Sequence, residues 1–184
     1  MTKKETLGKL VWIDLEMSGL DLEKDVILEI ASIITDDTLT VIEEGPSLVI
    51  HQSKEIMNNM NQWCTEHHKK SGLTDAVLAS TTTIEEAEQK TLEFIQKHCP
   101  QGTGILSGNS VWQDRNFLQK YMPRITDYLH YRILDVTSIK VVARKWYPNN
   151  PHAEYKKKDT HRALDDIYES IAELQNYRKY FFQQ

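Results

Sequence analysis

A change in the spacing of apolar residues constrains the fold of this chain more than any other feature. Three apolar runs come first, at residues 9–16, 26–36 and 46–51. Short links rich in turn-forming residues join them, which favours an antiparallel meander of three strands. After that point helical periods alternate with short apolar runs. We expect helices at residues 53–70, 82–99, 109–122, 137–147 and 161–181, and two further strands at residues 104–108 and 132–136.

This order predicts an α/β fold with one mixed five-stranded sheet, a three-strand antiparallel meander plus two parallel strands, flanked by helices. A length of 184 residues suits a single domain, 1–184, with its core at about residues 10–180. Apolar residues make up 40% of the chain and charged residues 27%, as in soluble globular proteins. No stretch approaches the roughly 20 apolar residues of a membrane span, so we expect no membrane partner.

Charge and cysteine content narrow the class of protein further. The net charge of −5 argues against tight binding to long duplex nucleic acid, which needs many phosphate contacts. A short nucleic acid held by a local basic patch and metal ions stays compatible with that charge. Cys64 and Cys99 lack metal-binding spacing and the N-terminus lacks a signal-peptide pattern, so we expect free thiols and a cytoplasmic location.

Two acids interrupt the first apolar run, VWIDLEM, at Asp14 and Glu16. Alternate side chains of a strand share a face, so these carboxylates would lie roughly 6–7 Å apart at their backbones. Like charges at that distance repel by about 3 kcal/mol at an effective dielectric constant near 20. A divalent cation would turn this repulsion into attraction, although Asp-x-Glu also occurs at exposed edges without any metal.

Two helices add further acids. The apolar stripe of the last helix consists of Ala163, Ile167, Ile171 and Leu174. Asp166 lies about 60–80° from the centre of that stripe and Asp165 nearly opposite, so Asp166 is the one that leans toward the core. Asp114 falls in the first turn of the helix that Asn109 or Ser110 caps, where an acid is often only a favourable cap.

The four carboxylates Asp14, Glu16, Asp114 and Asp166 are hard oxygen ligands, which suit Mg²⁺ or Mn²⁺ better than zinc. The segment WCTEHH offers no second ligand pair that would complete a zinc site. His161 begins the last helix one turn before Asp166. A histidine there is usually just solvated, but its ordinary pKa near 6.5 also suits it to take a proton from water.

Taken together, three segments resemble the three motifs of the DEDDh superfamily of 3′–5′ exonucleases. They are WIDLEMSGLD with Asp14 and Glu16, SGNSVWQDRNFL with Asp114, and HRALDDIYES with His161 and Asp166. The segments DLEMSGLD and HYRILDV narrow the resemblance to the oligoribonuclease family, over about Leu10 to Tyr180. The chain departs from the family pattern at Ser18, where threonine is usual, and in DVTS, where DVST is common.

The resemblance implies a ribonuclease H-like fold and a 3′–5′ exoribonuclease that hydrolyses very short RNA to nucleoside 5′-monophosphates. Asp14, Glu16 and Asp166 would bind one divalent ion, Mg²⁺ or Mn²⁺. Asp14 would share a second ion with Asp114, which reaches it directly or through water. His161 would act as the general base.

The resemblance also implies residues that select 5′-phosphorylated dinucleotides. Leu20 would wedge between the last two bases, and Trp63 and His68 would line a base pocket. The ordinary alternatives are a hydrophobic turn residue for Leu20 and core packing for Trp63. The 5′-phosphate would meet Ser110, Arg132 and either Thr137 or Ser138. His130 and Tyr131 would complete the active site of the neighbouring subunit in a homodimer, whereas the ordinary reading of Tyr131 is a half-buried ring with a wet hydroxyl.

Two alternatives remain from the sequence. One is a proofreading-type DNA exonuclease with the same chemistry. The other is a non-catalytic nucleic-acid-binding domain of the same fold, which should have lost at least one acid of the set. The lysines at 156–158 most simply belong to a solvated loop.

Overall fold

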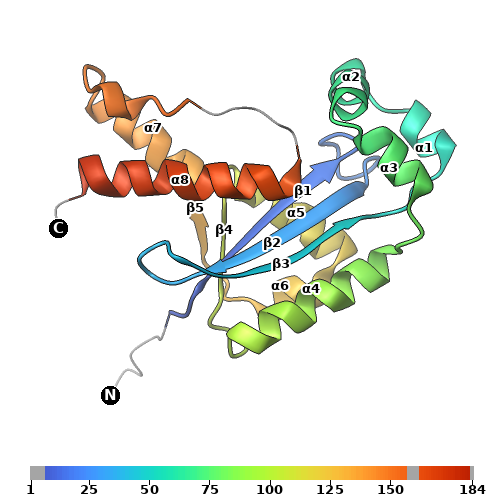
Figure 1. Cartoon of the computed structure of the whole chain (residues 1–184), viewed down its shortest axis with the longest axis horizontal. Helices are drawn as coiled ribbons and strands as arrows, with labels where there is room; N and C mark the ends of the chain where they lie inside the picture. Colours follow the sequence, from blue (N-terminus) through green and yellow to red (C-terminus); the bar gives the residue numbers. More distant parts are fainter. Residues whose placement is uncertain (1–6, 157–161, 183–184) are drawn as a thin grey trace.

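A computed structural model of the chain describes residues 7–156 and 162–182 (Figure 1). The strands are β1 (Leu10–Met17), β2 (Ile27–Thr35), β3 (Val41–Val49), β4 (Ile105–Gly108) and β5 (Ile133–Asp135). The helices before β5 are α1 (Lys54–Asn58), α2 (Gln62–Lys70), α3 (Leu73–Ala79), α4 (Ile84–His98), α5 (Val111–Tyr121) and α6 (Pro123–Tyr128). After β5 come α7 (Val136–Trp146), the 3₁₀ turn η1 (Pro151–Ala153) and α8 (Ala163–Phe181).

The five strands form one mixed sheet in the order β3-β2-β1-β4-β5. Strands β1, β2 and β3 pair antiparallel, whereas β4 and β5 run parallel to β1. This arrangement confirms the predicted meander with two added parallel strands. It also makes β1 the central strand, so that its carboxyl end opens onto the edge of the sheet where β4 and β5 end.

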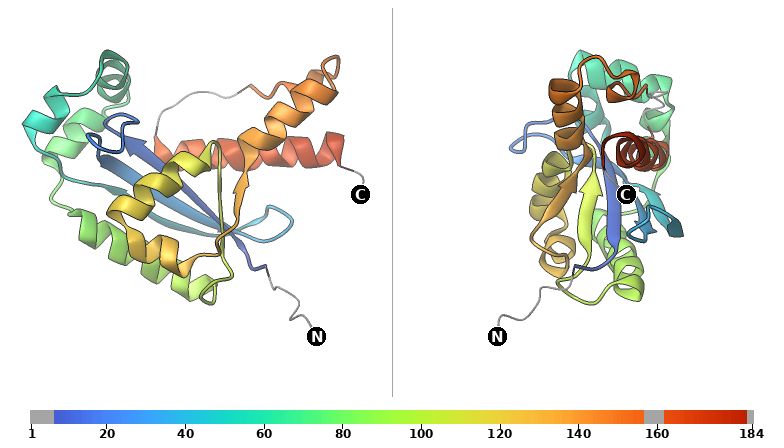
Figure 2. Two further views of the ribbon diagram at one scale, coloured as in Figure 1. Left: turned by 180° about the vertical axis from the view of Figure 1, so that it is seen from behind. Right: turned by 90° about the vertical axis from the view of Figure 1, so that its left-hand side faces the viewer.

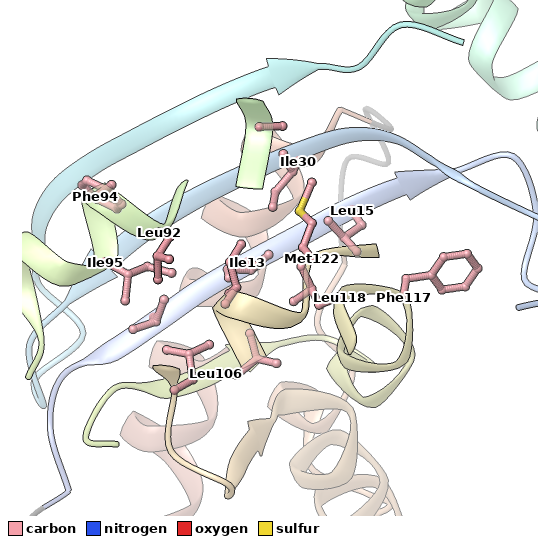
Figure 3. Packing of buried hydrophobic residues seen from close by; sticks show 14 of the residues in the cluster. Ile13, Leu15, Ile30, Leu92, Phe94, Ile95, Leu106, Phe117, Leu118 and Met122 are labelled. Carbon is pink, nitrogen blue, oxygen red and sulfur yellow. The ribbon is translucent and has the colours of Figure 1, made fainter. Parts of the chain in front are cut away.

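Successive residues of β1 face opposite layers of the protein, because side chains alternate along a strand. Ile13 and Leu15 pack toward Leu118 and Met122 of the α5–α6 region (Figure 3). Trp12 points the other way, into the core beneath α7 and α8. Figure 2 shows α5 and α8 on opposite faces of the sheet. Asp14 and Glu16 share the parity of Trp12 and therefore belong to the α8 face.

Several boundaries differ from those expected, each for a local reason. Strand β3 begins five residues earlier, because its first half is an exposed edge that carries Glu43 and Glu44 rather than an apolar run. The helix expected at residues 53–70 is divided, since Asn61 caps α2 by accepting from the Cys64 N–H at 2.9 Å. The short helices α3 and α6 were not expected. Pro123 at the first position of α6 made that segment read as a loop.

At the start of α4, Thr83 and Glu86 form a reciprocal capping box. In the described residues, no helix is both long and apolar enough to cross a membrane. Both cysteines, Cys64 and Cys99, are free and buried.

Candidate active site

Three carboxylates meet where the start of α8 lies over the carboxyl end of β1 (Figure 1). One oxygen each from Asp14, Glu16 and Asp166 can be chosen so that all lie within 4.8 Å of one another. Asp14 and Glu16 project from the same face of β1, as the alternation of the strand requires. Asp166 comes from the first turn of α8 and is partly buried, whereas Asp165 is exposed. The helical-wheel prediction that chose Asp166 over Asp165 is therefore confirmed.

The electrostatics of this cluster favour a bound cation. The pKa of the Glu16 carboxyl is raised to about 8, first by burial and then by the neighbouring carboxylates of Asp166 and Glu29, against the opposing charge of Arg162. A carboxyl group with this pKa keeps its proton at neutral pH unless positive charge is added. Three converging oxygens of hard carboxylate ligands fit Mg²⁺ or Mn²⁺, which supply that charge. The residues present therefore fit the metal that the motifs imply.

Asp114 is buried in the first turn of α5 and lies outside the group of three acids just described. Its Oδ1 accepts a hydrogen bond from the Leu15 N–H at 3.0 Å, so it is fixed between Asp14 and Glu16 on the chain of β1. Burial raises the pKa of Asp114 to about 8, while the bond from Leu15 opposes the shift. Asp114 thus serves as more than the simple helix cap that was its ordinary reading.

Leu20 stands between two cavities near these acids. Its side chain is 67% exposed. A cavity of about 380 Å³ on one side is lined by Glu16, Leu20, Trp63 and His68 among others. A cavity of about 560 Å³ on the other side is lined by Asp14, Leu20, Asn109, Ser110 and Asp114 among others. An exposed leucine shared by two cavities has the geometry expected of a wedge between two bases.

The loop that carries Leu20 is held by its own polar groups. Ser18 Oγ donates to Asp25 Oδ1 at 2.9 Å and accepts from the Val26 N–H at 3.1 Å, so the serine supplies the hydroxyl that threonine usually provides here. A Cβ added to Gly19 would lie 2.3 Å from Asp25 Oδ2. Position 19 therefore tolerates only glycine without movement of the loop.

The pocket beyond Leu20 is built by α2. Trp63 is 55% exposed and stacks on the His67 ring with centroids 3.9 Å apart, so the alternative of a core tryptophan is wrong. His68 is buried, and its Nε2 donates to the Met17 carbonyl oxygen at 2.9 Å. Its Nδ1 lies 3.9 Å from Glu16 Oε2. His68 thus joins the pocket to one of the clustered acids.

Ser110 and Thr137 come together beyond the ends of β4 and β5. Their hydroxyl oxygens lie 3.1 Å apart. Ser110 has a left-handed backbone with φ of 51°, and its N–H donates to Asp135 Oδ1 and Thr137 Oγ1. The side chain of Ser110 makes no cap bond to α5, so the expected side-chain cap is absent from this described segment. Of the two candidates left open, Thr137 adjoins Ser110, while Ser138 is exposed on the next position of α7.

The segment before β5 lies apart from these groups. The His130 ring is buried and stacks on Tyr131, whose side chain is 63% exposed. The Arg132 guanidinium lies 4.8 Å from the centre of the Tyr131 ring. The register pairs Val11 with Leu106 and Leu106 with Ile133. Tyr131 precedes that level by two residues while Asp14 follows it by three, so the two residues lie toward opposite ends of these strands.

The sequence analysis overlooked three residues around the acids: Asn109, Glu29 and Arg162. The expected general base, His161, lies outside the described residues. Asn109, considered only as a cap, accepts from Thr137 Oγ1 at 3.1 Å and donates to Glu173 Oε2 at 3.0 Å. Glu29 is a buried acid on β2 that pairs with Arg162 at the start of α8. An acid within an otherwise apolar run was the sequence signal that could have drawn attention to Glu29, although not to its partner Arg162.

Comparison with known proteins finds relatives that match nearly the whole chain. The RNase_T family model, described as an exonuclease, matches residues 11–174. A probable oligoribonuclease from Dictyostelium discoideum is 56% identical over 95% of this chain and 90% of that protein. The human mitochondrial oligoribonuclease is 52% identical over 95% of this chain and 73% of its own length. An oligoribonuclease from Francisella tularensis subsp. novicida is 51% identical over 95% of this chain and 97% of its own length.

Solved structures show the same fold at much lower sequence identity. Exonuclease I from Methylocaldum szegediense superposes with a TM-score of 0.73 at 16% identity, over 95% of this chain and 41% of that one. Exonuclease I from E. coli, in complex with an oligonucleotide, gives a TM-score of 0.72 at 14% identity, over 96% of this chain and 42% of its own. The chain thus spans less than half of these exonucleases, and the likeness extends to the fold alone.

Proposed function

We propose a substrate and a mechanism from one premise: this chain belongs to the oligoribonuclease family and is accordingly a metal-dependent 3′–5′ exoribonuclease. That premise removes the alternative of a non-catalytic domain. Its substrates are very short RNA chains, above all 5′-phosphorylated dinucleotides, and its products are nucleoside 5′-monophosphates. Two divalent ions, Mg²⁺ or Mn²⁺, serve the reaction.

The observation that carries the proposal is the convergence of Asp14, Glu16 and Asp166 within 4.8 Å. These three residues hold one ion, and Asp14 shares a second with Asp114, directly or through water. The buried position of Asp114 beside Leu15 supports its inclusion. When bound, the ions stabilise charge on the entering and the leaving oxygen of the phosphodiester.

The reaction balances as a simple hydrolysis. The oxygen of water forms a bond to phosphorus as the bond from phosphorus to the 3′ oxygen breaks. His161 takes the proton that the water loses and returns it to solvent, and the 3′ oxygen takes up a proton from solvent and leaves as a hydroxyl. This role for His161 comes from the family motif, since the residue lies outside the described ranges.

The cavities on the two sides of Leu20 support a substrate of two nucleotides. Trp63 presents an exposed ring to one base, and stacking on an aromatic ring tolerates any base. His68 lines the same cavity. Ser110 and Thr137, in the region of the other cavity, hold the 5′-terminal phosphate, with Ser138 as a further hydroxyl donor. A longer RNA has no terminal phosphate at that point, so such a cap favours the shortest chains.

We propose further that His130 and Tyr131 act in the site of a second copy of the chain, and that Arg132 contacts the 5′-terminal phosphate. The place of His130 and Tyr131 before β5, toward the opposite end of the strands from Asp14, supports this division of labour. The neighbouring helix α7 also exposes Val141, Val142 and Trp146, the last of them by 72%. Exposed apolar side chains of this size mark an interface, and an isologous homodimer would bring each Tyr131 to its partner.

The reading that remains as a rival is a DNA exonuclease of the same chemistry. A timed digest of 5′-phosphorylated RNA, from the dinucleotide to about ten nucleotides, separates the two when run beside the same ladder in DNA. We expect the RNA dinucleotide to disappear fastest with Mg²⁺ or Mn²⁺ and no cleavage with chelator. Preference for long single-stranded DNA would contradict the proposal.

The proposal also includes a cytoplasmic location, which is in keeping with the two free thiols.

A further inference from the structure

The start of helix α8 is held by Glu29, an acidic residue of strand β2. Helix α8 has no capping hydrogen bond from the side chain of its own N-cap residue, Arg162. Instead the Ala163 N–H donates to Glu29 Oε2 at 3.4 Å, and Glu29 is only 1% exposed. The Arg162 guanidinium grips the same carboxylate, with Nε 3.2 and 3.1 Å from its two oxygens and Nη2 2.7 Å from Oε1. Glu29 therefore caps the helix and also neutralises the charge of its N-cap residue, Arg162.

Glu29 and Arg162 both lie next to the three clustered acids, Glu29 on the sheet and Arg162 at the start of α8. On the sheet, Glu29 stands directly opposite Glu16 in the register of β1 and β2. On the helix, the Asp166 N–H donates to the Arg162 carbonyl oxygen at 3.0 Å. An unbroken set of bonds thus runs from β2 through Arg162 to the backbone of Asp166.

The charges of the pair explain why both members are needed. The Glu29 carboxylate and the Arg162 guanidinium carry opposite charges, form an ion pair, and lie beside Glu16. Together they add almost no net charge near the acids, so cations are neither repelled nor attracted by the pair as a whole. Removal of Glu29 alone would leave a positive charge beside a site for cations.

We propose that Glu29 and Arg162 are positioning residues that fix Asp166 against Asp14 and Glu16, and so set the affinity of this chain for divalent cations. This inference rests on the proposed function, since it takes the three acids as metal ligands. We call the pair the β2–α8 clamp. Partners that orient metal ligands in this way typically change metal affinity or activity about 10–100-fold when they are removed.

The chain offers a matched control in a second clamp of the same design. Glu88 of α4 is 7% exposed, and its Oε1 accepts from the Arg124 N–H near the start of α6 at 2.8 Å. Its Oε2 lies 3.5 Å from Arg124 Nε. This pair also joins a buried acid to an arginine and to the backbone of that arginine, but it belongs to the α4–α6 layer on the opposite face of the sheet.

The test measures Mn²⁺ binding without RNA, by titration calorimetry, beside the melting temperature of each metal-free variant. We expect Glu29→Gln to weaken Mn²⁺ binding about 10–100-fold. Glu88→Gln should lower the melting temperature but leave Mn²⁺ affinity as in the wild type. Arg162→Lys keeps the charge but loses the two-pronged contact, so its affinity should fall between those of the wild type and Glu29→Gln.

Wild-type Mn²⁺ affinity in Glu29→Gln would overturn the clamp. If that variant does not fold, Arg162→Lys decides alone, and unchanged affinity there would overturn it equally. Asp14→Asn serves as the reference. If it loses Mn²⁺ binding while Glu29→Gln does not, only the clamp is wrong; if Asp14→Asn binds Mn²⁺ normally, the metal site and the clamp both fall.

Discussion

The carboxyl end of β1 and the segment before β5 build two very different kinds of surface. At β1, acids from two distant segments converge within one chain, and the buried Glu29 holds the second segment in place. Before β5, His130, Tyr131 and Arg132 stack on one another and leave the tyrosine ring largely exposed. The first region brings charged groups together within one chain, whereas the second presents an exposed aromatic ring at the surface.

Under the proposed homodimer, the two regions differ in which chain they serve. Groups that carry repelling charges must be placed by the fold itself, because only a rigid frame holds them together. Aromatic and cationic groups such as those before β5 are stable while exposed to solvent, so they can stay on the surface until a second molecule binds. We therefore expect variants in the first region to act on the chain that carries them, and variants in the second to act on its partner.

The largest effect should come from the first region. Asp14→Asn or Asp166→Asn should abolish hydrolysis of a 5′-phosphorylated dinucleotide, because each removes a ligand of the proposed cations. The fold should stay intact, and the metal-free melting temperature should rise because a repelling charge is lost. Circular dichroism beside the activity assay checks both. Activity within tenfold of the wild type would contradict the metal site.

Loss of the proposed base should have the next largest effect. We expect His161→Ala to slow the chemical step by about 10²–10⁴-fold, the usual contribution of a general base, with little change in metal binding. The wild-type rate should fall as the pH drops below about 6.5, where an ordinary histidine gains its proton. Single-turnover rates across pH measure this. The same pH profile in both proteins would show that another group takes the proton.

The second region calls for a complementation experiment. Homodimers of Tyr131→Ala and of Asp14→Asn should each be nearly inactive. A mixed dimer should regain one working site, because the Asp14→Asn chain lends its Tyr131 to the intact acids of its partner. If Tyr131 instead serves its own chain, the mixed dimer has no complete site and stays inactive.

Subunit exchange has to be demonstrated first, with two distinguishable affinity tags. Two stable homodimers side by side would otherwise give the same negative result. Mixing Asp14→Asn with Asp166→Asn is the control, because both changes strike the first region and no mixed dimer then contains an intact set of acids.

A smaller effect is expected on substrate choice. The wild type should prefer a dinucleotide with a 5′-phosphate over one without it, and Arg132→Ala should flatten that preference by about tenfold, equivalent to the loss of one charge-assisted hydrogen bond. Values of kcat/KM for the two dinucleotides give the ratio. Equal wild-type rates on both would count directly against a phosphate cap.

The smallest effect concerns stability without metal. The pKa of Glu16 rises on folding from 4.5 to about 8. A carboxyl group with a raised pKa binds more protons in the folded state, so the metal-free protein should lose stability as the pH increases from about 5 to 8. Thermal melts should show this decline, and Mn²⁺ should reverse it. Glu16→Gln should reduce the pH dependence to the part that Asp114 contributes, because the pKa of Asp114 is also raised to about 8. An unchanged slope would assign the whole dependence to other groups.

Much of this molecule follows from the sequence because its largest elements carry strong periods. The alternation in β1 and the stripe of α8 were enough to place Asp14, Glu16 and Asp166 on facing surfaces. The break at Asn61 was hidden because a capping asparagine does not interrupt a helical period. Glu29 and Arg162 escaped notice because their bond joins residues far apart in the chain, which no local pattern reports.

The capping of α8 by Glu29 has a consequence for the order in which the enzyme comes into being. Asp14 and Asp166 belong to the first and last elements of the described chain, and the last helix gains its cap only on a sheet that has already paired. Until α8 docks, the chain lacks one of the three clustered acids. On this assignment, a chain whose last helix is still to be synthesised cannot cut the RNA that surrounds it.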